Sequence, residues 1–138
     1  MSVNPNISEL KFHHIGLLVE NIESSIEHYA ELFGHNNISK VINVISQKVR
    51  VCFVKISEGN FIELVEPIGS ESVVHNLLKK NITYYHIAYK VKDIQKMVER
   101  LEIINYKKLE SFYSEAFSGK QCVFLYTPDG HLVELIEE

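Results

Sequence analysis

The chain has 138 residues, of which 46% are hydrophobic, and a formal net charge of −4 at pH 7. This length and composition predict a single compact domain, residues 1–138, that buries a core of its own. The negative charge gives no general attraction to nucleic acid or anionic lipid, so neither is expected as a partner.

The N-terminal stretch and the cysteines indicate the cellular compartment. The stretch up to Lys11 is polar and lacks the apolar segment of a signal peptide, and no apolar run approaches the length of a membrane span. Cys52 and Cys122 stand singly inside apolar runs, so we expect packed, reduced thiols rather than a disulfide or a metal site. A cytoplasmic enzyme or binding domain is therefore expected.

The first elements along the chain predict a strand and a helix. Phe12–Val19 is apolar and β-branched enough for a strand. Asn21 then stands at the N-cap of an amphipathic helix that Gly34 ends. Three further strands are predicted at Ile38–Ile45, Val49–Ile56 and Asn60–Glu66. The turn at residues 57–60 joins the last two as a hairpin.

The middle of the chain predicts a linking helix at about residues 71–80. It separates a first module, about residues 11–68, from a second module, about residues 83–137. Its expected apolar side consists of Val73, Val74, Leu77 and Leu78.

The second module repeats the order of the first. A strand is predicted at Thr83–Val91, and Asp93 caps a helix. The apolar positions of this helix are Ile94, Met97, Val98 and Leu101, and strands follow near Lys107–Phe112, Gln121–Tyr126 and His131–Ile136. The predicted fold is therefore α+β, with two paired β-α-β-β-β modules forming a curved mixed eight-stranded sheet around a cleft.

Two segments of the chain repeat each other in detail. His14–Val19 aligns with His86–Val91, and Phe61–Glu66 aligns with Leu132–Glu137. Each copy carries one histidine and one glutamate, and the two separations are nearly equal, 63 − 14 = 49 and 134 − 86 = 48 residues. One imidazole and one carboxylate per copy predict a four-ligand metal site.

Strand geometry and ligand chemistry support this prediction. Side chains alternate between the faces of a strand, so His14 and Glu63 can meet if the first and last strands of a module are neighbours. Two imidazoles and two carboxylates suit a divalent ion such as zinc, cobalt, nickel, manganese or iron. The alternative is that each pair is only a structural filler. A glutamate inside an apolar run is costly, and its occurrence twice in register with a histidine favours metal.

The chain resembles the vicinal oxygen chelate superfamily from about Lys11 to Glu137. That resemblance implies a divalent metal in a cleft, ligands at His14, Glu63, His86 and Glu134, and a homodimer. The stretches His13–Ile22 and Ile62–Gly69 resemble the methylmalonyl-CoA epimerases. This closer resemblance implies an acyl-CoA thioester substrate that loses the proton next to its carbonyl. It implies Glu134 as the catalytic base, with Glu63 as its counterpart.

Two other activities stay open. The compact Tyr126–His131 turn resembles glyoxalase I, an isomerase of hemithioacetals, but Leu18 and Pro67 stand where similar glyoxalases hold glutathione. Non-enzymatic sequestration of a small molecule is also open, and a ring-cleaving dioxygenase ranks lower because those members use a single carboxylate ligand. Lys90 shares the strand face of His86, so we expect it to bind a substrate carboxylate or phosphate, or else to be a solvated lysine.

Overall fold

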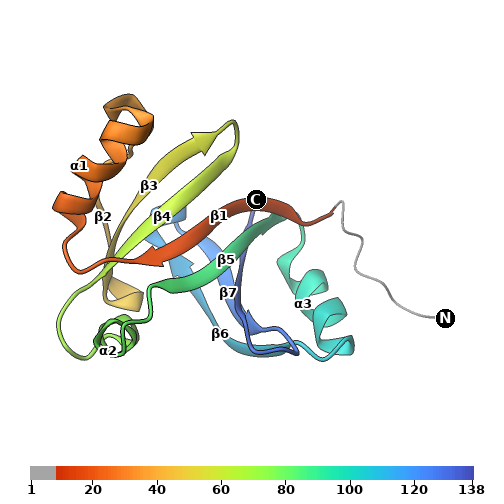
Figure 1. Ribbon diagram of the computed structural model, residues 1–138. Coiled ribbons are helices and arrows are strands. Elements are labelled where there is room, and N and C mark those ends of the chain that lie inside the picture. The colour runs from red at the N-terminus through yellow and green to blue at the C-terminus, as the bar shows by residue number, and fades with distance from the viewer. Residues whose placement is uncertain (1–8) are drawn as a thin grey trace. The chain divides into compact units, whose positions relative to one another are not determined.

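The computed structural model describes residues 9–138 (Figure 1). The chain divides into two units. The N-terminal unit is His14–Tyr85, and the C-terminal unit consists, among the described residues, of residues 9–13 together with His86–Glu138. Among the described residues, no helix is long and apolar enough to cross a membrane.

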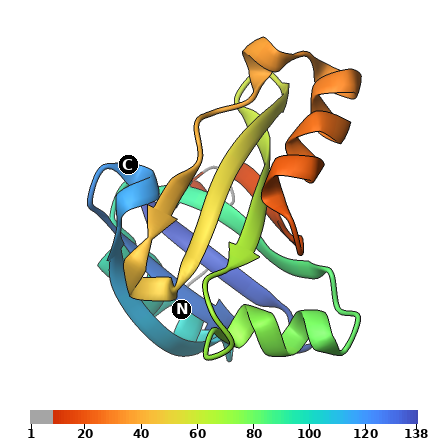
Figure 2. The ribbon, with the colours of Figure 1, turned by 90° about the vertical axis from the view of Figure 1, so that its left-hand side faces the viewer.

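The N-terminal unit is a four-stranded mixed sheet with two helices. Its strands are β1 (Lys11–Leu18), β2 (Ile42–Val44), β3 (Val49–Ser57) and β4 (Asn60–Pro67), and its helices are α1 (Ile22–Phe33) and α2 (Val73–Lys79). The strand order is β2-β3-β4-β1, with β1 parallel to β4 and the other pairs antiparallel. Figure 2 shows α1 along the β3–β4 hairpin.

The C-terminal unit repeats this arrangement with one helix. Its elements are β5 (Tyr84–Val91), α3 (Ile94–Ile103), β6 (Lys107–Ser114), β7 (Lys120–Tyr126) and β8 (Leu132–Glu137). The strand order is β5-β8-β7-β6, and β5 is parallel to β8. The α+β class and the β-α-β-β-β order of each module are therefore confirmed. The first and last strands of each module are neighbours, which is the condition under which the histidine and the glutamate of a module can meet.

The helices begin at the predicted caps and cover one face of their own sheets. The side chain of Asn21 accepts a hydrogen bond from the backbone N–H of Ser24 at 2.9 Å, and that of Asp93 accepts one from Lys96 at 3.1 Å. Each bond satisfies a donor that the first turn of a helix leaves free. In the N-terminal unit, Ile22 of α1 forms a buried core with Cys52, Val54 and Leu64 of the sheet. In the C-terminal unit, α3 packs on a core that includes Val91, Val123, Leu125, Val133 and Leu135.

The strand predicted at Ile38–Ile45 is shorter than expected. Only Ile42–Val44 forms β2, and 3-10 turns lie at His35–Asn37 and Ile45–Gln47. The second turn ends at Lys48 with a left-handed backbone (φ 55°), which reverses the chain into β3. Ile38 forms only an isolated bridge with Val54. The apolar, β-branched composition of Ile38–Ile45 is typical of an extended chain, but composition alone does not predict these local chain reversals.

The linking helix has a narrower apolar side than predicted. Val74 is 1% exposed, whereas Val73, which we expected beside it, is 68% exposed. Val73 is the first helical residue, directly after the Ser72 cap, and a seven-residue helix has fewer than two turns to bury. Both cysteines are free and buried, as predicted.

Candidate functional site

In the N-terminal unit, His14 and Glu63 form a buried pair on adjacent parallel strands. Gly16 of β1 lies directly beside Glu63 of β4, and His14 is two residues earlier on the same face of β1. The Nε2 atom of His14 lies 3.3 Å from Oε1 of Glu63. The parallel pairing of first and last strands therefore brings together the two residues that the sequence singled out in this module.

In the C-terminal unit, His86 and Glu134 form the same arrangement. Ala88 of β5 lies beside Glu134 of β8, and His86 is again two residues earlier. The distance from Nε2 of His86 to Oε1 of Glu134 is also 3.3 Å. The two repeats thus place the same two groups with the same strand offset and the same separation.

All four side chains are withdrawn from solvent. His14 and His86 are 0% and 2% exposed, and Glu63 and Glu134 are 6% and 4% exposed. Burial of a carboxylate is unfavourable unless a positive group or a good hydrogen-bond donor faces it. Both modules bury a carboxylate at the matching position despite this unfavourable free energy. This repetition indicates that the two pairs serve a function beyond packing.

Each pair also lies beside a phenylalanine that the sequence did not single out. Phe53 of β3 pairs directly with Glu63, and its ring lies 5.4 Å from the His14 ring at 72°. Phe124 of β7 pairs directly with Glu134, and its ring lies 5.5 Å from the His86 ring at 65°. The sequence does contain one indication of these phenylalanines. Each stands ten residues before the glutamate of its own module, 63 − 53 = 10 and 134 − 124 = 10, so the two phenylalanines belong to the repeat.

Lys90 lies half-buried on β5, beside Ile136 of β8. Its positive charge is one of the smaller influences that lower the pKa of Glu138, after the hydrogen bond from Lys11. Lys90 therefore lies toward the end of β5, on the strand that carries His86.

The remaining histidines take no part in the two pairs. His13 is half-buried, and its ring lies 5.5 Å from that of Phe117. His28, His35 and His131 are exposed, whereas His75 is half-buried.

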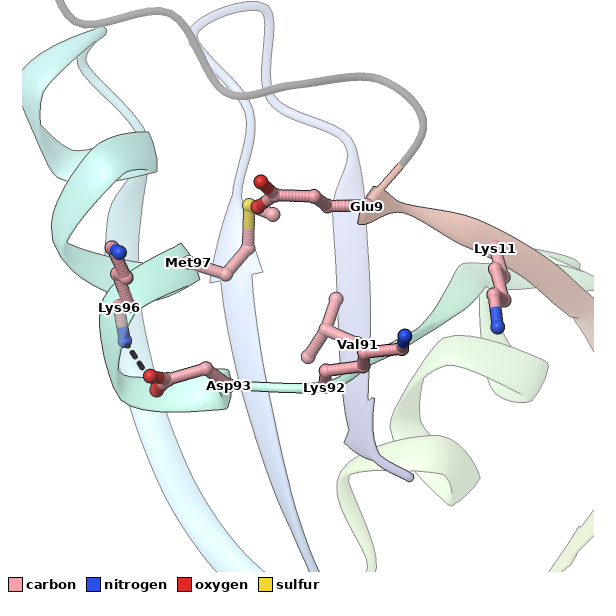
Figure 3. Close-up of a pocket in the computed structure, with 7 residues that line it drawn as sticks. All are labelled: Glu9, Lys11, Val91, Lys92, Asp93, Lys96 and Met97. Atoms are coloured by element: carbon pink, nitrogen blue, oxygen red, sulfur yellow. Dashed lines mark hydrogen bonds between the residues drawn. The ribbon is translucent and has the colours of Figure 1, made fainter.

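A pocket of about 450 Å³ lies elsewhere in the C-terminal unit, at the start of α3 (Figure 3). Its lining includes Lys92, Lys96 and the apolar Met97. It contains neither His86 nor Glu134 and is thus a separate feature of this unit.

The geometry of each pair fits two ligands of one metal ion. Imidazole nitrogen and carboxylate oxygen bind ions such as zinc at about 2.0–2.2 Å. Neighbouring ligand atoms of one ion then lie roughly 3.0–3.5 Å apart, from octahedral to tetrahedral geometry. The separation of 3.3 Å in both pairs lies in this range. The donor set also suits borderline divalent ions.

Comparisons with known proteins indicate the family of the chain. The chain is 33% identical over 132 residues to the mitochondrial methylmalonyl-CoA epimerase of Dictyostelium discoideum, covering 93% of this chain and 78% of that protein. A hypothetical protein of Bacillus halodurans has a similar structure, with a TM-score of 0.76, 28% identity and 94% coverage of both chains.

A second solved structure is a variant of Streptomyces coelicolor methylmalonyl-CoA epimerase in complex with 2-nitronate-propionyl-CoA. It matches with a TM-score of 0.75 and 25% identity, covering 93% of this chain and 96% of that one. Residues 13–137 match the model of the Glyoxalase/Bleomycin resistance protein/Dioxygenase superfamily. That range includes both modules and all four paired residues, and the chain belongs to this superfamily.

Proposed function

We propose that the two His–Glu pairs bind one divalent metal ion together, and that the chain is an epimerase that removes a proton next to the carbonyl of an acyl-CoA thioester. The observation that carries this proposal is the duplicated pair, with the same burial and the same 3.3 Å separation in each unit. Each of the four residues offers one ligand atom. Zinc, cobalt, nickel, manganese and iron all suit these ligands.

The similarity to named enzymes supports the reaction class. The Dictyostelium relative is a methylmalonyl-CoA epimerase, and the Streptomyces epimerase structure contains 2-nitronate-propionyl-CoA. A bound divalent ion supplies Lewis-acid stabilisation of the negative charge that develops when a C–H next to a carbonyl loses its proton. Methylmalonyl-CoA or a related acyl-CoA is therefore the proposed substrate.

The carboxylates have the proton-transfer roles in this proposal. Glu134 accepts the proton from one face of the α carbon. Glu63, its counterpart in the other repeat, donates a proton to the opposite face of that carbon. Both carboxylates lie in apolar strands, where Leu64 and Leu135 are fully buried, so little water competes for the proton. Return of a proton to the other face of the carbon completes the epimerisation.

Lys90 is the proposed contact for a negative group of the substrate. It is half-buried on the strand of His86, and its flexible ammonium group can bind a carboxylate or a phosphate. Lys90→Gln should raise KM for an acyl-CoA more than it lowers kcat, because the lysine binds substrate and transition state alike. An unchanged KM would remove this role.

Deuterium exchange tests the reaction. Metal-loaded protein in heavy water should introduce deuterium at the α carbon of 2-methylmalonyl-CoA, and Glu134→Gln should abolish the exchange. Glu137→Gln is the matched control, because Glu137 is three residues later on β8 and on the opposite face. This control should exchange at the rate of the parent.

Other outcomes of the same experiment identify the alternatives. Turnover of a hemithioacetal without labelling of any acyl-CoA would replace the epimerase with a glyoxalase-like isomerase. Ligand binding without exchange on any C–H acid would indicate a sequestering protein and would remove Glu134 as a base.

The proposed assembly is a homodimer, because the resemblance to the superfamily implies one. Sedimentation equilibrium at micromolar concentration should give twice the chain mass of 15.9 kDa. A monomer mass at this concentration would contradict the proposal.

A further inference from the structure

In the N-terminal unit, two rings meet across the strand that carries the carboxylate. The order β3-β4-β1 puts Phe53 and His14 on strands separated by β4, about 9.5 Å apart at two strand spacings. Their ring centroids are nevertheless only 5.4 Å apart. Both side chains therefore lean over β4, at the level of Glu63, which pairs directly with Phe53.

The C-terminal unit repeats this arrangement with different residues around it. The order β5-β8-β7 separates His86 from Phe124 by the strand of Glu134, and the two ring centroids lie 5.5 Å apart. Phe124 pairs directly with Glu134. An aromatic ring against the imidazole, above the carboxylate strand, is thus part of the repeat.

These contacts limit how the imidazoles can turn. The ring torsion of a histidine is broad, so its orientation depends on what surrounds it. An edge-to-face aromatic contact, at 72° for His14 and 65° for His86, favours one ring plane. In that plane, Nε2 of each histidine lies 3.3 Å from its carboxylate.

We propose that Phe53 and Phe124 are positioning residues that hold the two imidazoles in the orientation needed to bind metal. This inference rests on the proposed metal site. Removal of a hydrogen-bonding partner that orients a metal ligand commonly costs about 10- to 100-fold in metal affinity, and loss of a ring that fixes the same orientation should act in the same direction. The two phenylalanines act through the histidines and contact neither substrate nor reacting atoms in this proposal.

The two phenylalanines are supported differently. Phe53 lies edge-to-face with Phe61 of β4 at 6.2 Å, whereas Phe124 stacks on Phe112 of β6 at 5.4 Å and 27°. Phe53 is half-buried and Phe124 is buried. Substitutions at the two positions can therefore be compared as independent tests of one role.

The experiment compares Phe53→Leu and Phe124→Leu with Phe12→Leu as a matched control. Phe12 forms a similar edge-to-face pair with Tyr89, at 6.4 Å and 77°, and this ring contact is with a tyrosine rather than with His14 or His86. Leucine keeps an apolar side chain at each position, so all three variants should fold. Cobalt binding is measured by competition with a chelator, and the imidazole N–H protons of the cobalt-loaded proteins are observed by NMR.

Phe53→Leu and Phe124→Leu should each weaken cobalt binding by about tenfold or more. Each should shift the resonance of its own histidine, while Phe12→Leu keeps the parent affinity and spectrum. Phe53→Tyr, which retains a ring, should restore the affinity. A folded Phe53→Leu and Phe124→Leu that both bind cobalt within twofold of the parent would overturn this inference alone. A parent chain that binds no cobalt would overturn the metal proposal and this inference with it.

Discussion

At the scale of single residues, the protein buries two carboxylates where a purely structural core would have apolar side chains. Glu63 and Glu134 are the buried acidic residues of the described chain, and each faces an imidazole of its own unit. Removing an ion from water costs several kcal/mol even after the surroundings relax. A bound cation offsets this cost, so the stability of the protein should depend on metal.

Glu63→Gln and His86→Ala test this dependence in separate units. At metal concentrations about one hundred times Kd, binding should stabilise the parent by about 2.7 kcal/mol. Each substitution removes one ligand, so most of this metal-induced stabilisation should disappear. Thermal unfolding with and without a chelator measures the effect. A metal-induced rise in Tm as large as in the parent would show that the substituted residue is no ligand.

The thiol of Cys52 should be unreactive in the folded protein. Burial raises its pKa to about 11, and the nearby charge of Glu63 adds to the rise. At pH 8, roughly one thiol in a thousand is then the reactive thiolate, and this fraction grows as the pH rises toward 11. Iodoacetamide at pH 8 should modify Cys52 only after denaturation. Rapid labelling of the native protein would contradict the buried position.

At the scale of elements, the sequence predicted the start of a helix correctly where the capping residue and the apolar spacing indicate the same position. The caps Asn21 and Asp93 and the spacing of apolar residues predicted the starts of α1 and α3, because a cap and a 3.6-residue period fix the same boundary. The strand predicted at Ile38–Ile45 was wrong in extent. Its bounds depend on two tight reversals that apolar composition does not encode.

The linking helix gives a direct test at this scale. Val74→Ala should lower the free energy of unfolding by about 2 kcal/mol, because Val74 is buried. The neighbouring Val73→Ala should change it by less than about 0.5 kcal/mol, because Val73 is exposed. Urea unfolding of both variants measures the difference. Equal losses would contradict the observed orientation of α2.

At the scale of the whole molecule, the duplication made the paired residues predictable. The register of the repeat identified His14 with Glu63 and His86 with Glu134, since an internal repeat places equivalent residues at equivalent positions. Phe53 and Phe124 were missed because an aromatic residue in a strand is the normal content of a core. Their proposed role depends on the strand orders β3-β4-β1 and β5-β8-β7, which bring each phenylalanine to its histidine and which local sequence patterns do not predict.

The central claim is that the two pairs bind one ion, and metal stoichiometry tests it most directly. Elemental analysis of gently purified protein, followed by calorimetric titration of the chelated protein, should give one divalent ion per chain. His14→Ala in the N-terminal unit and His86→Ala in the C-terminal unit should each abolish tight binding. Two ions per chain, no ion, or tight binding that survives both substitutions would contradict a shared site.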